Sequence, residues 1–197
     1  MIETAITVLR FGDRRLPHAL ASLPTADGAA GIDAAIQDAR RVIVVGSDAD
    51  LAVVLTRLMR VERLDIEVAH IPGRRGARRA LSETARRVPL IRDDSATVLV
   101  GAALWLPANG LDALRGEAVV DDTVLFDGEV AGVRIEPTAA MPGLRATVTT
   151  GRRRWLAGRA VQLGTTGARV VRDGEAGPRE VKRSTFYRHT TGWLRVG

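Results

Sequence analysis

The feature that most constrains the fold is the alternation of strand-like and helix-like segments in the first half of the chain. Residues 41–45 (RVIVV) form the apolar run of a buried strand, and residues 50–64 follow with helical periodicity. The apolar positions that share one face of this helix are Leu51, Val54, Leu55, Leu58 and Met59. Because strands that alternate with helices form parallel sheets with right-handed crossovers, this half predicts a small α/β domain.

Other segments of the first half continue the same alternation. Residues 4–9 and 64–72 have the composition of strands, and the second of these carries apolar residues at alternate positions. Residues 31–40 and 77–87 predict helices. The order strand, helix, strand, helix predicts a parallel sheet in residues 1–92.

The pattern changes after about Val88, where helical periodicity gives way to short apolar or alternating runs. Asn-Gly, Asp-Gly, Pro-Gly and Thr-Gly pairs separate these runs, as expected for strands joined by tight turns. The runs are residues 97–106, 117–126, 130–137, 144–150, 159–164, 168–173 and 179–188. Residues 93–197 therefore predict a second, β-rich domain with an antiparallel, sandwich-like sheet.

Composition excludes several classes of protein. The chain of 197 residues has no cysteine, which excludes disulfides, thiolate metal sites and a cysteine nucleophile. His18, His70 and His189 are too scattered to predict a metal cluster. No apolar run approaches the length of a membrane span, and the first residues lack a signal pattern. We expect a cytoplasmic protein, with a peripheral position at a membrane as the alternative.

The charge of the chain indicates an anionic partner. All but one of its 29 basic residues are arginine, and the formal net charge is +6. The planar fork of arginine suits phosphate groups, so nucleotide, nucleic acid or an acidic membrane surface would fit. A coding bias toward alanine, arginine, glycine and valine explains the same composition without any partner.

The turn after the buried strand, residues 46–50 (GSDAD), has two interpretations. A glycine turn between a strand and a helix is where many α/β proteins hold a phosphate. Alternatively, Gly46 lets the chain leave the strand, Ser47 or Asp48 caps the helix, and Asp50 lies where the helix dipole favours an anion.

Three motifs together resemble the diacylglycerol kinase family of lipid kinases, which are relatives of sphingosine kinases and more distantly of NAD kinases. Residues 46–51 (GSDADL) occupy the frame of the family's GGDGT turn and its following leucine. Residues 71–81 keep the Ile-Pro start and Ala-Leu end of the family's next loop. Residues 173–175 supply the late Asp-Gly-Glu. The family's order of an α/β domain followed by a β-rich one agrees with the composition.

The resemblance implies phosphoryl transfer from ATP, with Mg²⁺, to a lipid hydroxyl. It gives Asp48 a catalytic role on the metal or phosphate side and makes Glu175 the candidate base. The implied nucleotide-binding residues are Gly46, Ser47, Asp48, Gly73, Arg74, Arg75 and Gly76. It also implies that a homodimer can form. For Glu175 the alternative is a solvated carboxylate in a hairpin turn.

Departures from the family pattern predict that the kinase activity is impaired or lost in a degenerate, shortened member. Ser47, Ala49 and Asp50 replace glycine, glycine and threonine, so the backbone approaches a phosphate less closely and a carboxylate faces it. The second loop lacks the family's asparagine and aspartate, and the N-terminal segment lacks its phosphate loop. The alternative function is a non-catalytic module that binds anionic lipid or nucleic acid through its arginines.

Two further stretches bear on that alternative. Residues 73–76 (GRRG) open a helix, as do the loops with which KH domains clamp single-stranded nucleic acid. Residues 152–154 place three arginines beside Trp155, for which we expect a hairpin with the arginines outward and the tryptophan packed inward. The second Asp-Gly-Glu, residues 127–129, is expected to be a turn between strands.

Overall fold

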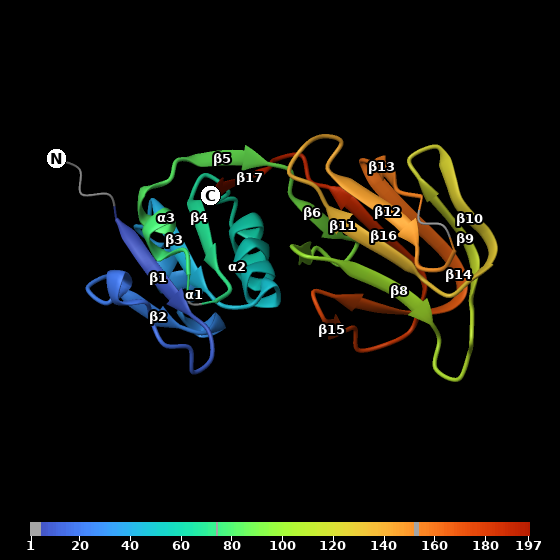
Figure 1. Cartoon of the computed structure of the whole chain (residues 1–197), viewed down its shortest axis with the longest axis horizontal. Helices are drawn as coiled ribbons and strands as arrows, with labels where there is room; N and C mark the ends of the chain where they lie inside the picture. Colours follow the sequence, from blue (N-terminus) through green and yellow to red (C-terminus); the bar gives the residue numbers. More distant parts are fainter. Residues whose placement is uncertain (1–4, 74, 152–153) are drawn as a thin grey trace. The chain divides into compact units, whose positions relative to one another are not determined.

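The computed structural model describes residues 5–73, 75–151 and 154–197, and it divides the chain into two compact units. The first unit contains residues 1–88 and 191–197, and the second contains residues 89–190. Figure 1 shows the elements of both units. The sequence pattern assigned all of residues 93–197 to the second domain, whereas the last seven residues return to the first unit.

The first unit is built on a six-stranded sheet in the order β2-β1-β3-β4-β17-β5. Its strands run parallel except β5, which is antiparallel to β17. The elements are β1 (Ile6–Arg10), η1 (His18–Leu20), β2 (Thr25–Asp27), η2 (Ala29–Gly31), α1 (Ile32–Ile36), β3 (Arg41–Val45), α2 (Asp48–Arg60), β4 (Glu67–Ile71), α3 (Ala77–Ser82), β5 (Ala85–Val88) and β17 (Trp193–Val196). The predicted parallel α/β sheet is confirmed.

Helices cover the two faces of this sheet. One face packs its alternate residues, such as Ile43 and Ala69, against Ala77 and Ala80 of α3. On the other face, α2 buries the predicted stripe of Leu51, Val54, Leu55, Leu58 and Met59. The shorter α1 lies on the α2 side, where Asp33 pairs with Arg57 of α2. The central strand β3 is thereby buried on both faces along its whole length, as in other parallel sheets.

The helix predicted over residues 77–87 is wrong in its second half. Helix α3 ends at Ser82, Glu83 takes an extended conformation, and residues 85–88 form the edge strand β5. Strand β5 pairs with β17, a four-residue strand from the far end of the sequence. Helical periodicity alone could not reveal this pairing, because the partner lies about a hundred residues away.

A buried arginine holds the end of α3. Arg41, at the start of β3, is 8% exposed. Its guanidinium donates to the carbonyl oxygens of Ala80 (2.9 Å), Leu81 (2.8 Å) and Glu83 (2.9 Å), which are left without partners where the helix ends. The same guanidinium pairs with Glu67 at 2.6 Å. Arg41 therefore fixes the position of α3 on the sheet.

Replacing Arg41 with methionine is expected to lower the free energy of unfolding by about 3 kcal/mol, because Glu67 is left as an uncompensated, mostly buried charge. Urea denaturation followed by circular dichroism measures the change. The matched control is Arg57→Met, which breaks the exposed pair with Asp33 and should cost about 1 kcal/mol or less. Equal losses in the two variants would contradict the role given to Arg41.

The second unit is one large antiparallel sheet. Its main strand order is β13-β12-β11-β8-β14-β16-β6-β7, with β9 and β15 also paired to β14 and β10 paired to β9. The strands are β6 (Ile91–Asp93), β7 (Val98–Leu99), β8 (Ala103–Pro107), β9 (Leu114–Val120), β10 (Thr123–Val130), β11 (Val133–Pro137), β12 (Leu144–Val148), β13 (Leu156–Gly158), β14 (Ala160–Arg172), β15 (Glu175–Ala176) and β16 (Val181–Arg188). The predicted β-rich second part is confirmed.

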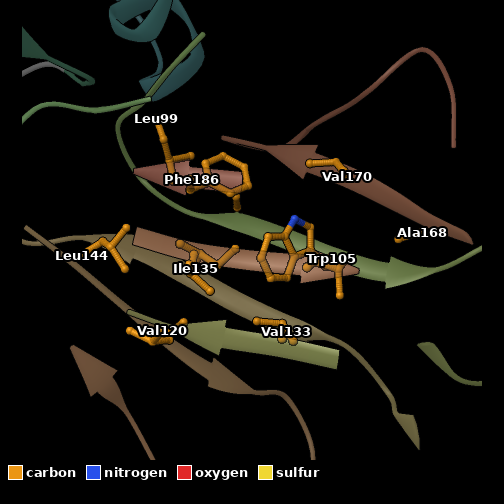
Figure 2. Packing of buried hydrophobic residues seen from close by; sticks show 14 of the residues in the cluster. Leu99, Trp105, Val120, Val133, Ile135, Leu144, Ala168, Val170 and Phe186 are labelled. Carbon is orange, nitrogen blue, oxygen red and sulfur yellow. The ribbon is translucent and has the colours of Figure 1, made fainter. Parts of the chain in front are cut away.

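The core of this unit is formed by alternate residues of the strands, which point to one side of the sheet (Figure 2). Trp105 and Phe186 are its largest members, both fully buried, with ring centroids 6.0 Å apart. The indole Nε1 of Trp105 donates to Ser184 Oγ at 2.9 Å, so the one polar atom of the ring is satisfied.

Two turn predictions in this half are wrong. The runs at residues 159–164 and 168–173 belong to one strand, β14, whose edge pairs with β9 in its first part and with β8 in its second. Residues 127–129 lie inside β10, opposite residues 115–117 of β9, and form no turn. Gly128 has a φ of 111°, so the glycine is used within a strand that Asp-Gly composition alone assigned to a turn.

Candidate functional site

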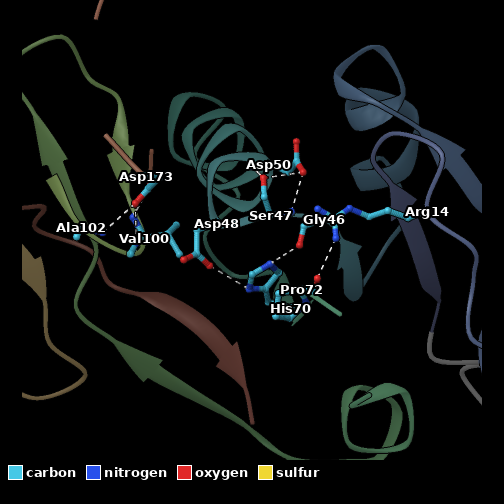
Figure 3. A network of polar contacts seen from close by, with 11 residues as sticks. Arg14, Gly46, Ser47, Asp48, Asp50, His70, Pro72, Val100, Ala102 and Asp173 are labelled. Carbon is cyan, nitrogen blue, oxygen red and sulfur yellow. Dashed lines mark hydrogen bonds and ion pairs between the residues drawn. The ribbon is translucent and has the colours of Figure 1, made fainter. Parts of the chain in front are cut away.

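Three loops of the first unit meet at the carboxyl edge of its sheet. They follow β1, β3 and β4, which are neighbours in the sheet. The backbone N–H of Phe11 donates to Val45 O at 3.0 Å, and that of Gly46 donates to Ile71 O at 3.2 Å. Arg14 donates from Nη1 to Pro72 O at 2.8 Å (Figure 3). This edge brings the 46–50 turn together with the loop that begins at Pro72, which is the usual place for a ligand in a parallel sheet.

A capping box closes the turn at residues 46–50. The Oδ2 atom of Asp50 accepts from the backbone N–H of Ser47 at 2.7 Å and from Ser47 Oγ at 2.8 Å. In return, the backbone N–H of Asp50 donates to Ser47 Oγ at 3.2 Å. The carboxylate of Asp50 thus lies at the N-terminus of α2, where the helix dipole stabilises an anion.

Gly46 is required by this same carboxylate. A Cβ added at Gly46 would lie 2.7 Å from Asp50 Cβ and 2.8 Å from Asp50 Oδ2, closer than van der Waals contact allows. The φ of Gly46 is not in the left-handed region that favours glycine. Close approach of Asp50 is therefore sufficient to explain the glycine, without a bound phosphate.

Asp48 points away from the capping box toward β4. Its Oδ1 lies 3.8 Å from Nδ1 of His70, and about half of the Asp48 side chain is exposed. The Nε2 atom of His70 is 3.0 Å from Gly46 O and donates to that carbonyl. Asp48 and His70 consequently form an ion pair when the imidazole is protonated (Figure 3).

Sequence reasoning missed His70 as a neighbour of Asp48. The register pairs Val44 of β3 with His70 of β4, which places the imidazole beside the start of the turn. The available signal was the alternation along β4, which separates Val68 and His70 from the residues that face α3. The alternation within β4 does not reveal that β3 is the neighbouring strand, so it could not place His70 beside Asp48.

The second predicted loop is open to solvent. Gly73, Arg75 and Gly76 are exposed, and Gly76 has a φ of 108°, which favours glycine at the start of α3. Among the described residues, no group lies within 4 Å of a Cβ added at Gly73 or Gly76. Arg74, predicted as a nucleotide-binding residue, lies outside the described residues.

The Asp-Gly-Glu at residues 173–175 forms a hairpin turn between β14 and β15. Asp173 and Gly174 have φ values of 49° and 91°, and Arg172 pairs with Glu175 across the turn, as expected for the Asp-Gly type I′ geometry. Glu175, the predicted base, is exposed on β15 of the second unit.

The carboxylate of Asp173 is occupied by backbone amides. It accepts from the N–H groups of Val100 (3.1 Å), Gly101 (2.7 Å) and Ala102 (3.1 Å), three consecutive residues (Figure 3). Asp173 therefore holds the loop between β7 and β8 by the same chemistry with which Asp50 closes the first turn.

Trp155 does not pack into the core as we expected. It is half-buried, and the guanidinium of Arg145 stacks on its ring at 4.3 Å from the centroid. Arg145 also pairs with Glu136 at 2.6 Å. Burial opposes ionisation of Glu136, but Arg134 and Arg145 outweigh it and hold its pKa below the usual value. Residues 152–153 lie outside the described part of the chain.

Residues 5–73, 75–151 and 154–197 contain neither a metal cluster nor a membrane-spanning helix. In these ranges no three histidine, aspartate or glutamate side chains are grouped so that they could hold a metal ion. Within the same ranges, no helix has both the length and the apolar character that crossing a membrane requires.

If Gly46 is required only by Asp50, the two positions must be energetically coupled. We expect Gly46→Ala to cost about 2 kcal/mol in the native chain, as overpacking does, and much less in an Asp50→Gly background, where the clashing side chain is absent. Thermal or urea unfolding of the two single variants and the double variant measures the coupling. Additive costs would contradict the steric explanation.

Comparison with solved structures identifies the fold. The chain matches a diacylglycerol kinase from Bacillus anthracis str. Sterne with a TM-score of 0.75 and 11% identity, covering 98% of this chain and 96% of that one. It matches an NAD kinase from Archaeoglobus fulgidus, in complex with ATP, with a TM-score of 0.67 and 11% identity, covering 98% and 93%. Two further Bacillus anthracis Sterne structures match with TM-scores of 0.78 and 0.77.

Sequence comparison adds no closer relative. No family model matches the chain, and no curated protein matches it. The resemblance inferred from the three motifs is nevertheless confirmed at the level of structure, over nearly the full length. The chain has the fold shared by diacylglycerol kinases and NAD kinases.

Proposed function

We propose that this chain is a diacylglycerol-kinase-like protein that has lost ATP-dependent phosphorylation of a lipid hydroxyl. The observation that carries the proposal is the carboxylate of Asp50, which accepts the Ser47 N–H at the start of α2. A nucleotide phosphate bound at this turn would need the same amide. The chain therefore carries its own anion in the position that the resemblance assigns to ATP.

Electrostatics and sterics act in the same direction. Two negative charges 4 Å apart repel by about 1 kcal/mol in water and by about 4 kcal/mol near a protein surface. Asp48 adds a second carboxylate two residues away from Asp50, and it is half exposed. Ala49 carries a methyl group where the family has glycine, so the backbone is less accessible to a phosphate.

The remaining parts of the phosphotransfer machinery do not fit Mg²⁺-ATP either. Such a reaction needs a metal that neutralises phosphate charge and a base that accepts the hydroxyl proton. Among the described residues, Asp48 has His70 as its neighbour but no second carboxylate in a metal-binding group. Asp173 is engaged by three amides, and Glu175 is an exposed hairpin residue. The ATP in the Archaeoglobus NAD kinase structure is a property of that protein.

Isothermal titration calorimetry with Mg²⁺-ATP at near-physiological salt tests the proposal. We expect no saturable heat with the native chain, and no transfer of labelled phosphate to diacylglycerol in detergent micelles. The Archaeoglobus NAD kinase serves as the positive control for nucleotide binding. Saturable binding by the native chain, or phosphate transfer that disappears in Asp48→Asn, would overturn the proposal.

A variant without the Asp50 carboxylate tests whether this carboxylate is the reason that ATP does not bind. Ser47→Gly combined with Asp50→Thr deletes the capping box and approaches the family pattern at both positions. This variant is expected to bind Mg²⁺-ATP more tightly than the native chain, because both the competing carboxylate and its repulsion are gone. Its fold is checked by circular dichroism before the titration.

A further inference from the structure

The strongest unexplained feature of the first unit is a cluster of arginines from two segments far apart in the sequence. The first segment is the loop after β1 with η1, residues 11–20, and the second is the loop that leads into α3 together with α3 and its C-cap, residues 72–73 and 75–83. Arg14 donates to Pro72 O at 2.8 Å, and Leu16 and Leu20 pack in the same apolar cluster as Ala77 of α3. We call Arg14, Arg15, Arg75, Arg78 and Arg79 the arginine surface.

The arginine surface is poorly neutralised. Within the described part of the chain, no acidic side chain pairs with Arg15, Arg75 or Arg78, and all three are exposed. Arg79 faces Glu83 at 3.5 Å, but 81% of the arginine side chain is exposed, so this pair contributes little. Asp13 and Glu83 are the only acidic residues on the two segments, which leaves a net positive charge.

Three other arginines of the same unit are paired closely, whereas the exposed Arg40, Arg60, Arg86 and Arg195 have no ion pair among the described residues. Arg10 pairs with Asp27 at 2.7 Å, Arg57 with Asp33 at 2.6 Å, and Arg41 with Glu67 at 2.6 Å. In the first two pairs the arginine side chains are 37% and 43% exposed and the aspartates 62% and 66%. Arg15, Arg75 and Arg78 differ from these paired arginines in having no carboxylate partner among the described residues.

The chemistry of this surface favours a phosphodiester backbone. Guanidinium forks bind phosphate oxygens in pairs, and several arginines spread over two segments match the repeated phosphates of a polymer. The large apolar side chains that the structure describes as exposed are Val53, Leu111, Val124 and Met141, and none of them belongs to these segments. The surface thus offers nothing to insert into a bilayer, which membrane-binding surfaces usually do.

The same surface offers no means of reading bases. The only aromatic residue on the two segments is Phe11, which is buried, so there is no platform on which an unpaired base could stack. Contacts limited to phosphates position a protein on a duplex without sequence specificity. We propose that the arginine surface binds the phosphate backbone of double-stranded nucleic acid, independently of base sequence.

Fluorescence anisotropy with a short labelled DNA duplex tests the proposal on the full chain. The native protein is expected to bind two duplexes of unrelated sequence with equal affinity, and the affinity is expected to fall steeply as salt is raised. The variant Arg75→Glu/Arg78→Glu/Arg79→Glu should bind at least about tenfold more weakly, and its salt slope should decrease by about 0.9 for each phosphate that is no longer neutralised.

A matched control separates a local site from net charge. Arg179→Glu/Lys182→Glu/Arg183→Glu reverses three exposed charges in the second unit and changes the net charge by the same amount. This control should keep nearly native affinity. Equal losses in the two variants, absence of duplex binding by the native chain, or binding to phosphatidylserine vesicles but not to DNA would overturn the proposal. None of these outcomes depends on whether the chain binds ATP.

Discussion

The hydrogen bonds between Asp50 and Ser47 determine what the carboxyl edge of the first sheet can do. They satisfy the backbone amides of Ser47 and Asp50 at the start of α2, place a negative charge at the positive end of that helix, and require glycine at position 46. Residues 46–50 resemble a degenerate phosphate-binding turn, but the capping of α2 accounts for Gly46, Ser47 and Asp50 without a ligand. A helix start with these properties is stable without a ligand.

The same principle recurs in the second unit. Three consecutive amides, those of residues 100–102, converge on the carboxylate of Asp173, as amides converge on anions in backbone cradles. Asp50 and Asp173 both come from motifs that suggested kinase chemistry. In each case a side-chain carboxylate of the chain itself accepts the backbone amides, so the structural role is sufficient to explain the residue.

Patterns within short segments of the sequence predicted those strands and helices whose burial depends on the segment's own residues. The apolar run at 41–45 and the periodic stripe of α2 specify a buried strand and its covering helix, since both are buried as the patterns require. The early end of α3 and the return of β17 depend on contacts with Arg41 and β4, which are distant in sequence. No periodicity within residues 77–87 or 193–196 encodes those partners.

The candidate site was predictable in its position but not in its chemistry. Parallel strands place the turns at residues 46 and 72 at one edge, as the alternation of elements implied. Whether Asp50 faces a ligand or closes its own helix depends on one side-chain rotamer, which composition does not specify. His70 beside Asp48 likewise required the strand register.

NMR observation of the Ser47 backbone amide tests the central claim most directly. In a ¹⁵N-labelled sample, an amide that donates to the Asp50 carboxylate is expected to keep its chemical shift when Mg²⁺-ATP is added, and to shift when Asp50 is replaced by alanine. A saturable shift of the Ser47 amide on addition of Mg²⁺-ATP to the native chain would mean that phosphate displaces the carboxylate, and would contradict a turn closed by its own anion.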